Sequence, residues 1–208
     1  MYIDLNILGG AGSLPEDIFY CDIRMANGLG SRLISTPSTE SWLINLAKIM
    51  ELKKREVDIY PRIIFCRNRF PKGSRIVHDC VDERIIRELM KQNWKVADLR
   101  LFNLWYHGNS LDMVVDVGNK LDEALDIIRM SYAVSLFYQQ VESAGGFPIR
   151  AAFAEFEGQG VILSAPGGVG KSTCMTRLIL PWRALCDDEV LIIPGDRGVY
   201  HAHPFPTW

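Results

Sequence analysis

A glycine-rich run from Ala165 to Thr173, with the sequence Ala-Pro-Gly-Gly-Val-Gly-Lys-Ser-Thr, constrains this chain more than any other feature. The residues from Val161 to Ser164 before it predict a short strand, and those from Lys171 to Leu180 after it predict a helix that Pro181 stops. A strand, a glycine-rich loop and a helix in this order form the context that a phosphate-binding loop requires. The alternative is an ordinary glycine-rich turn with a lysine beside it.

The residue types in the loop suit an anionic ligand. Glycines leave successive main-chain N–H groups free to surround a phosphate, and the start of the helix adds further N–H groups. Lys171 supplies a positive charge for the outer phosphates, and the Ser172 hydroxyl is placed to bind magnesium. Ala165 stands where glycine is usual. We therefore expect ATP and Mg²⁺ to bind here, through Ala165, Pro166, Gly167, Gly168, Val169, Gly170, Lys171, Ser172 and Thr173.

A pair of carboxylates, Asp187 and Asp188, directly follows a predicted strand from Ala184 to Cys186. A strand running beside the loop strand would deliver both carboxylates to the phosphate end of the sheet, because ligands of open α/β sheets bind at the carboxyl ends of strands. One carboxylate can hold magnesium, and another can accept a proton from an attacking hydroxyl. The alternative is an acidic turn between two strands.

The pattern predicts an α/β chain in two parts, with a boundary near Gly145. Residues 1–144 form a mixed α+β region in which we find no motif that indicates a role, and residues 145–208 form the nucleotide-binding domain. The expected elements of the first part are a strand from Tyr2 to Leu8, a helix from Glu40 capped by Thr39 or Ser38, a strand from Arg62 to Cys66, a helix from Asp82 to Met90, strands from Val96 to Trp105 and from Leu111 to Val117, and a helix from Asn119 to about Glu142.

The helix from Glu40 should bury Trp42, Leu43, Leu46, Ile49 and Met50, and the long helix should bury a face with Leu121, Leu125, Ile128, Tyr132 and Leu136. The stretch from Ser13 to Pro37 is rich in turn residues and gives no prediction. In the second part, strands are expected from Phe153 to Glu157, and as a hairpin from Val190 to Ile193 and Val199 to Ala202.

The composition argues against some classes of function. The formal net charge of −2 argues against a nucleic-acid binder, although the segment from Lys53 to Arg75 is basic and predicts a solvated face or a patch for an anionic partner. The five cysteines are odd in number and far apart, which is typical of reduced thiols in a cytosol. No apolar run reaches the roughly 18 to 20 residues of a membrane helix. We expect a cytoplasmic protein with no membrane partner, and self-association into a homo-oligomer stays open.

The close spacing of Gly170-Lys171-Ser172 and Asp187-Asp188 resembles the HPr serine kinase/phosphorylase family, which is similar to phosphoenolpyruvate carboxykinase. The loop, the segment Leu185-Cys-Asp-Asp-Glu189 and the segment His203-Pro-Phe-Pro-Thr-Trp208 further resemble the family of the SynChlorMet cassette protein ScmC, which accompanies peptide-modification genes. The resemblance is specific over residues 150–208. It implies that Asp188 is the proton acceptor, that Lys171 contacts the transferred phosphate, that Ser172 binds the metal, and that Asp187 supports the metal or the base.

Two departures from the HPr kinase pattern matter. Arg150 stands where that family has a histidine that orients the base, and an arginine cannot accept a proton. The family also continues beyond the position of Trp208 and supplies a further metal-binding glutamate, so we expect the domain to be incomplete here. The leading hypothesis is an ATP-dependent serine kinase acting on a protein or peptide. The other is a catalytically impaired nucleotide-binding module that serves as an assembly or regulatory subunit.

Overall fold

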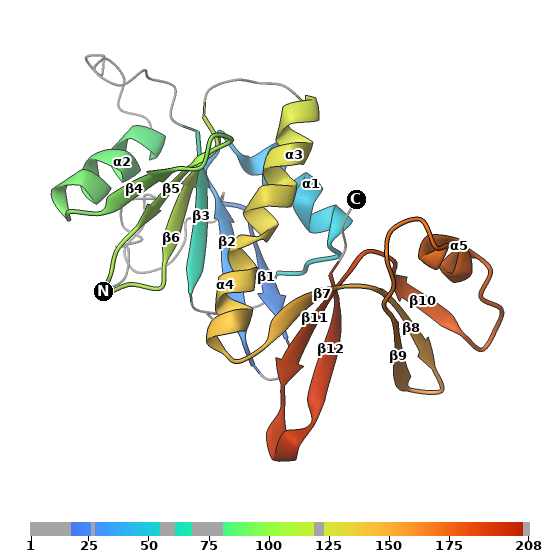
Figure 1. The fold of residues 1–208 in the computed structure, drawn as a ribbon. Coiled ribbons are helices and arrows are strands. Elements are labelled where there is room, and N and C mark those ends of the chain that lie inside the picture. The colour runs from blue at the N-terminus through green and yellow to red at the C-terminus, as the bar shows by residue number, and fades with distance from the viewer. Residues whose placement is uncertain (1–17, 26–27, 55–60, 68–80, 119–122, 206–208) are drawn as a thin grey trace. The chain divides into compact units, whose positions relative to one another are not determined.

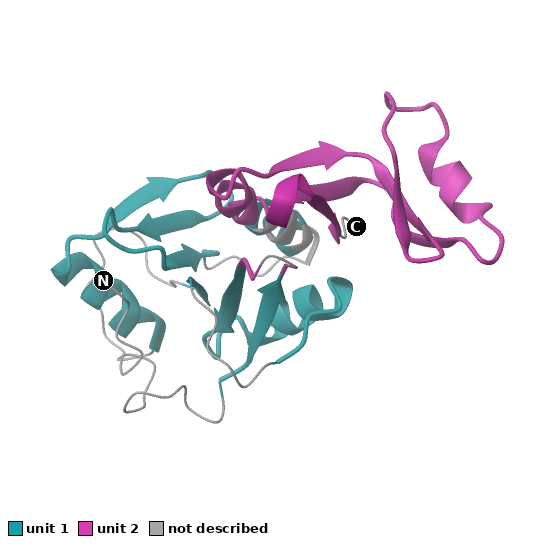
Figure 2. Cartoon of the chain, turned by 90° about the horizontal axis from the view of Figure 1, so that it is seen from below, with its two compact units in different colours: residues 1–24, 30–133 teal, residues 25–29, 134–208 magenta. Residues whose placement is uncertain are grey.

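The computed structural model describes residues 18–25, 28–54, 61–67, 81–118 and 123–205. Their contacts divide the chain into two compact units (Figure 2): unit 1 holds residues 1–24 and 30–133, and unit 2 holds residues 25–29 and 134–208. Each unit combines strands with helices (Figure 1). The predicted α/β class is therefore confirmed at the level of a mixed fold with several sheets.

Unit 1 is built on a six-stranded mixed sheet with the order β1-β2-β3-β6-β5-β4. The neighbouring strands β2, β3 and β6 are parallel, and the remaining pairs are antiparallel. The strands are β1 (Tyr20–Arg24), β2 (Gly30–Ser35), β3 (Arg62–Cys66), β4 (Lys95–Asp98), β5 (Asn103–Tyr106) and β6 (Met113–Asp116). All five residues of β3 are buried, as expected for a parallel strand that is covered on both faces.

Helices cover both faces of this sheet. Helix α2 (Val81–Lys91) buries Ile85 and Leu89 in one cluster with Ile64. On the opposite face, Trp42 of helix α1 (Glu40–Ile49) lies with its ring centroid 4.6 Å from that of Phe65. Since neighbouring residues of a strand point to opposite faces, Ile64 and Phe65 anchor one helix each. The predicted strand from Arg62 to Cys66 and the predicted helix from Asp82 to Met90 are confirmed.

Several predictions about unit 1 are wrong in detail. The expected strand from Val96 to Trp105 is two strands, because Arg100 takes a left-handed conformation (φ 68°) and donates its N–H to the Asp98 carboxylate, which forms a turn. Strands β1 and β2 occupy the stretch that gave no prediction. The prediction that the first helix buries Ile49 is wrong, because Ile49 is 39% exposed. The Thr39 side chain does not cap α1; its hydroxyl donates to the Phe65 carbonyl instead.

The long predicted helix is interrupted. Helix α3 (Glu123–Val134) ends before Ser135, and α4 (Leu136–Ser143) follows it. The predicted buried face is wrong at Ile128 and Tyr132, which are 47% and 54% exposed, whereas Leu136 is buried. The expected strand from Tyr2 to Leu8 and the expected helix start at Asn119 and Leu121 lie outside the described residues.

Unit 2 contains two three-stranded antiparallel sheets, with the orders β12-β11-β7 and β10-β8-β9. Ala151, Phe153, Val190 and Ile192 form a buried cluster between them. The strands are β7 (Phe147–Arg150), β8 (Ala152–Phe156), β9 (Gln159–Leu163), β10 (Arg183–Cys186), β11 (Glu189–Pro194) and β12 (Tyr200–Phe205), and the helices are α4, α5 (Lys171–Thr176) and the 3₁₀ turn η2 (Asp196–Gly198).

Unit 2 contains two hairpins, one of β8 with β9 and one of β11 with β12. Glu157 and Gly158 connect β8 to β9 with φ values of 49° and 81°, the pair of positive angles that matches the twist of a two-residue hairpin. Strands β11 and β12 pair from Glu189 opposite Phe205 to Pro194 opposite Tyr200, as the sequence predicted for a hairpin over residues 194–198. No helix within the described ranges combines the length and the apolar character needed to cross a bilayer.

A buried ion pair fixes the edge of unit 1 where β3 begins. The Asp112 carboxylate, whose side chain is 0% exposed, accepts hydrogen bonds from the backbone N–H of Arg62 at 2.8 Å and from its Nη2 at 2.6 Å. We expect Asp112→Asn to lower the free energy of unfolding by about 3 kcal/mol or more, because it leaves the buried guanidinium charge uncompensated. Urea unfolding measures this loss.

The control for this variant is Glu88→Gln, which removes a solvent-exposed ion pair with Lys91. Its expected cost is at most about 1 kcal/mol. Equal effects of the two substitutions would contradict the assigned importance of the Arg62–Asp112 pair.

His203 on β12 makes the stability of unit 2 depend on pH. Burial and the neighbouring His201 lower the pKa of His203 below its ordinary 6.5. The unfolded chain therefore binds a proton that the folded chain does not, and the free energy of unfolding falls as the pH drops through about 6.5. We expect urea unfolding between about pH 7 and pH 5 to show this loss, and His203→Gln to reduce it. An unchanged pH slope in the variant would refute this assignment.

Candidate functional site

The glycine-rich loop joins β9 to α5, as the sequence predicted. Gly168 and Gly170 have φ values of 80° and 97°, in the left-handed region that favours glycine, and Gly170 directly precedes α5. The helix begins at Lys171 but ends at Thr176, so the prediction that it reaches Leu180 is wrong. Leu180 instead lies in the following turn and is 91% exposed.

Lys171 points its ammonium group at the loop that precedes it. Its Nζ donates to the carbonyl oxygens of Ala165 at 2.7 Å and Pro166 at 3.0 Å. Residues 162–170 are all exposed to solvent. An anion that enters the loop would therefore meet a positive charge that the loop itself already holds in place.

The strand order corrects one expectation and supports another. Strand β10 does not run beside the loop strand β9, because β8 lies between them. However, β9 and β10 are both antiparallel to β8, and their last residues Leu163 and Cys186 pair with Ala152 and Phe153. The loop and the Asp187-Asp188 turn therefore leave the sheet at the same edge.

Asp188 and the base of the loop are tied to one short connection between β7 and β8. The backbone N–H of Ala151 donates to the Asp188 carbonyl at 3.0 Å, and the Ser164 hydroxyl donates to the Arg150 carbonyl at 3.5 Å. The Arg150 Nε also donates to the Asp188 carboxylate at 3.0 Å. Asp188, Arg150 and Ser164 are thus brought together.

The proposed metal ligands are Ser172 and Asp187. Within the described part of the chain, no hydrogen bond joins the Ser172 hydroxyl to Asp187, and no cluster of three or more His, Cys, Asp or Glu side chains has the spacing of a metal site. Magnesium does not need such a cluster, because it commonly takes one or two protein oxygens, several waters and the phosphates of a substrate. The hydroxyl and carboxylate present are hard oxygen donors of the type that it prefers.

Sequence reasoning missed Tyr138 on α4. Burial raises the pKa of Tyr138 first, its hydrogen bond to the Glu189 carboxylate raises it further, and the charges of Glu189 and Asp188 add to the effect. The hydroxyl of Tyr138 therefore holds its proton more tightly than that of an ordinary tyrosine. The sequence around Tyr138 does not indicate this contact, because the partner Glu189 lies far along the chain, on β11.

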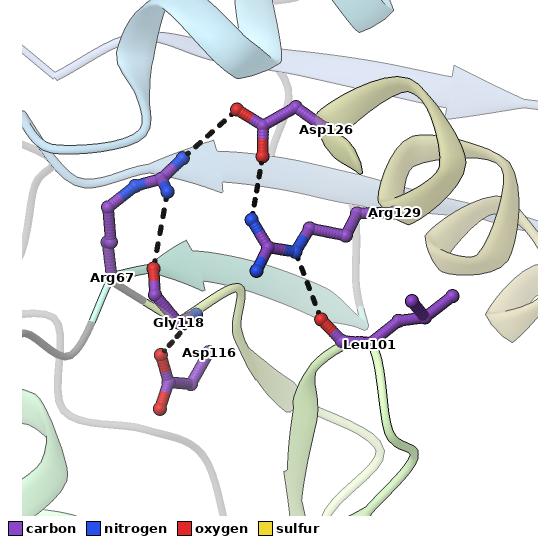
Figure 3. Close-up of polar contacts among 6 residues, drawn as sticks. All are labelled: Arg67, Leu101, Asp116, Gly118, Asp126 and Arg129. Atoms are coloured by element: carbon purple, nitrogen blue, oxygen red, sulfur yellow. Dashed lines mark hydrogen bonds and ion pairs between the residues drawn. The ribbon is translucent and has the colours of Figure 1, made fainter. Parts of the chain in front are cut away.

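A second polar cluster lies in unit 1, where the parallel strands end (Figure 3). Arg67, just after β3, donates to the Gly118 carbonyl at 3.2 Å and lies 3.4 Å from the Asp126 carboxylate. Arg129 lies 2.9 Å from the same carboxylate and donates to the Leu101 carbonyl.

This cluster ties α3 to the carboxyl ends of β3 and β6. Arg67 and Arg129 are 4% and 6% exposed, and both guanidinium groups contact the carboxylate of Asp126. The prediction of a solvated basic face between Lys53 and Arg75 is therefore wrong for Arg62 and Arg67, which are buried in ion pairs.

The fold and the site define a mixed α/β protein in which a glycine-rich loop and an acidic turn meet at one sheet edge. Residues 113–208 match the model of the family described as SynChlorMet cassette protein ScmC. The match begins at the first residue of β6 and includes α3, the loop and the acidic turn. It confirms the resemblance to ScmC, whereas the resemblance to HPr kinase stays a prediction. No curated protein matches the chain.

Proposed function

We propose that unit 2 binds ATP together with Mg²⁺ through residues 165–173. The observation that carries this proposal is the geometry of the loop: a strand, two glycines in the left-handed conformation, and a lysine ammonium held against the loop carbonyls. Free main-chain N–H groups and a fixed cation are what a triphosphate requires. The exposure of the whole loop leaves room for such a ligand.

The activity that this arrangement supports best is transfer of the γ-phosphate of ATP to a hydroxyl, with serine as the expected acceptor. The acceptor oxygen forms a bond to the γ-phosphorus while the bond to the β,γ-bridging oxygen breaks, so ADP leaves and the hydroxyl proton must be accepted. Asp188 is the proposed acceptor of this proton, and Lys171 offsets charge on the transferred group. Ser172 and Asp187 would hold Mg²⁺, which offsets negative charge on the phosphates when bound.

The acceptor hydroxyl belongs, in this proposal, to a protein or a peptide. The support is the description of the matching family as a cassette protein, since the products of a gene cassette act together. A small-molecule acceptor would need an enclosed pocket, whereas the loop and the acidic turn lie on exposed surface.

A second candidate function is a nucleotide-binding module that assembles or regulates its partners without transferring phosphate. The specific observation in its favour is the ion pair between Arg150 and Asp188, because the guanidinium occupies the carboxylate oxygen that an attacking hydroxyl would have to reach. Both candidates require the same ATP site, and they differ only in turnover.

The binding step is tested by calorimetry with ATP in magnesium buffer. We expect Lys171→Ala to weaken ATP binding about tenfold or more, because it removes a charge-assisted contact to the phosphates. Lys95→Ala, at an exposed position on β4, should bind ATP like the wild type. At about 100 times its Kd, ATP should stabilise the wild type by roughly 2.7 kcal/mol. Folded protein with no affinity for ATP or GTP would refute the proposal.

The transfer step is tested with γ-labelled ATP and candidate acceptors from the cassette. Asp188→Asn should abolish labelling while ATP binding persists, since an amide cannot take up the proton. Labelling that survives the substitution would show that Asp188 is not the base. ATP binding with no labelling of any cassette product would favour the non-catalytic module.

A further inference from the structure

Arg150 contacts both halves of the proposed site. Its backbone carbonyl accepts the hydroxyl of Ser164, the residue just before the glycine-rich loop, and its guanidinium holds the Asp188 carboxylate. It is also the last residue of β7, where it pairs with Glu189 of β11. A sheet strand therefore fixes the backbone of Arg150, while its side chain extends from the edge that carries the loop.

The ion pair with Asp188 is poorly suited to a purely structural role. The Arg150 side chain is 83% exposed and that of Asp188 is 42% exposed. Solvent screens a pair with this exposure, so it contributes little to the stability of the fold. The buried pair of Arg62 and Asp112 in unit 1 has the opposite character, with side chains 5% and 0% exposed. The Arg150 guanidinium can therefore change partners at small cost.

A phosphate is a better partner for this guanidinium than a single carboxylate. Arginine presents several N–H donors in a planar fork, which fits two oxygens of one phosphate, and its charge is permanent. In the structure the Arg150 Nε donates to Asp188 Oδ1 at 3.0 Å. A terminal phosphate at the glycine-rich loop would carry more negative charge than the carboxylate and would compete for the same donors.

We propose that Arg150 is a positioning residue that exchanges Asp188 for the terminal phosphate of ATP. This inference rests on the proposed function, and it adds a means by which the site distinguishes ATP from ADP. Without ATP, the guanidinium holds the Asp188 carboxylate at the edge of the sheet. With ATP, it turns to the terminal phosphate and leaves the carboxylate to accept the proton of the attacking hydroxyl, which passes from the acceptor oxygen to Asp188 and then to water.

The experiment compares the affinities of the intact chain for ATP and for ADP in magnesium buffer. We expect Arg150→Ala to weaken ATP binding about tenfold, as loss of a charged hydrogen bond does, and to change ADP binding less than about twofold. Arg183→Ala is the matched control, because Arg183 is also an exposed arginine of unit 2 in an ion pair, with Glu155. It should leave both affinities unchanged.

A second pair of variants tests the exchange itself. Asp188→Asn should tighten ATP binding, because it releases the guanidinium, and this gain should be smaller in the Arg150→Ala background. Equal gains in both backgrounds would overturn the exchange, as would an Arg150→Ala variant that binds ATP like the wild type or loses ATP and ADP equally. In those cases Arg150 forms a surface ion pair only, and the ATP site stands. Folded wild type without ATP affinity would instead refute the proposed function.

Discussion

The pairing of β8 with strands on both of its sides is the constraint on which unit 2 depends. Because β9 and β10 are each antiparallel to β8, they are parallel to each other and end at the same edge. The glycine-rich loop and the acidic turn need no direct contact to be neighbours. The short connection from Arg150 to Ala151 then binds both through backbone groups, so the geometry of the site is a property of the main chain.

Sequence patterns predicted the helices and strands that interactions between nearby residues determine. The strand β3, the helix α2 and the hairpin of β11 and β12 match their predictions, because apolar spacing and turn residues specify them within a few positions. The sequence also predicted the start of α5 at Lys171, since Gly170 permits the turn that precedes the helix. Of these elements, α5 and β11 border the candidate site.

The contacts that the sequence did not predict have a different cause: their two partners lie far apart in the chain. Arg62 lies 50 positions from Asp112, and Arg150 lies 38 positions from Asp188. Nothing in a basic segment tells which of its arginines will be buried beside a carboxylate from another strand. Ile128 was expected inside for a similar reason, because helical spacing identifies an apolar stripe but does not say whether another element covers it.

The left-handed glycines of the loop have one consequence for how this sequence can vary. A Cβ built at Gly168 or Gly170 would meet no atom within 4 Å. Clashes with other atoms of the protein are therefore not what restricts these two positions, whereas the backbone torsion disfavours a side chain at both. Alanine should be as poorly tolerated as leucine there, and asparagine, which enters this region most readily among the other residues, should be the mildest replacement.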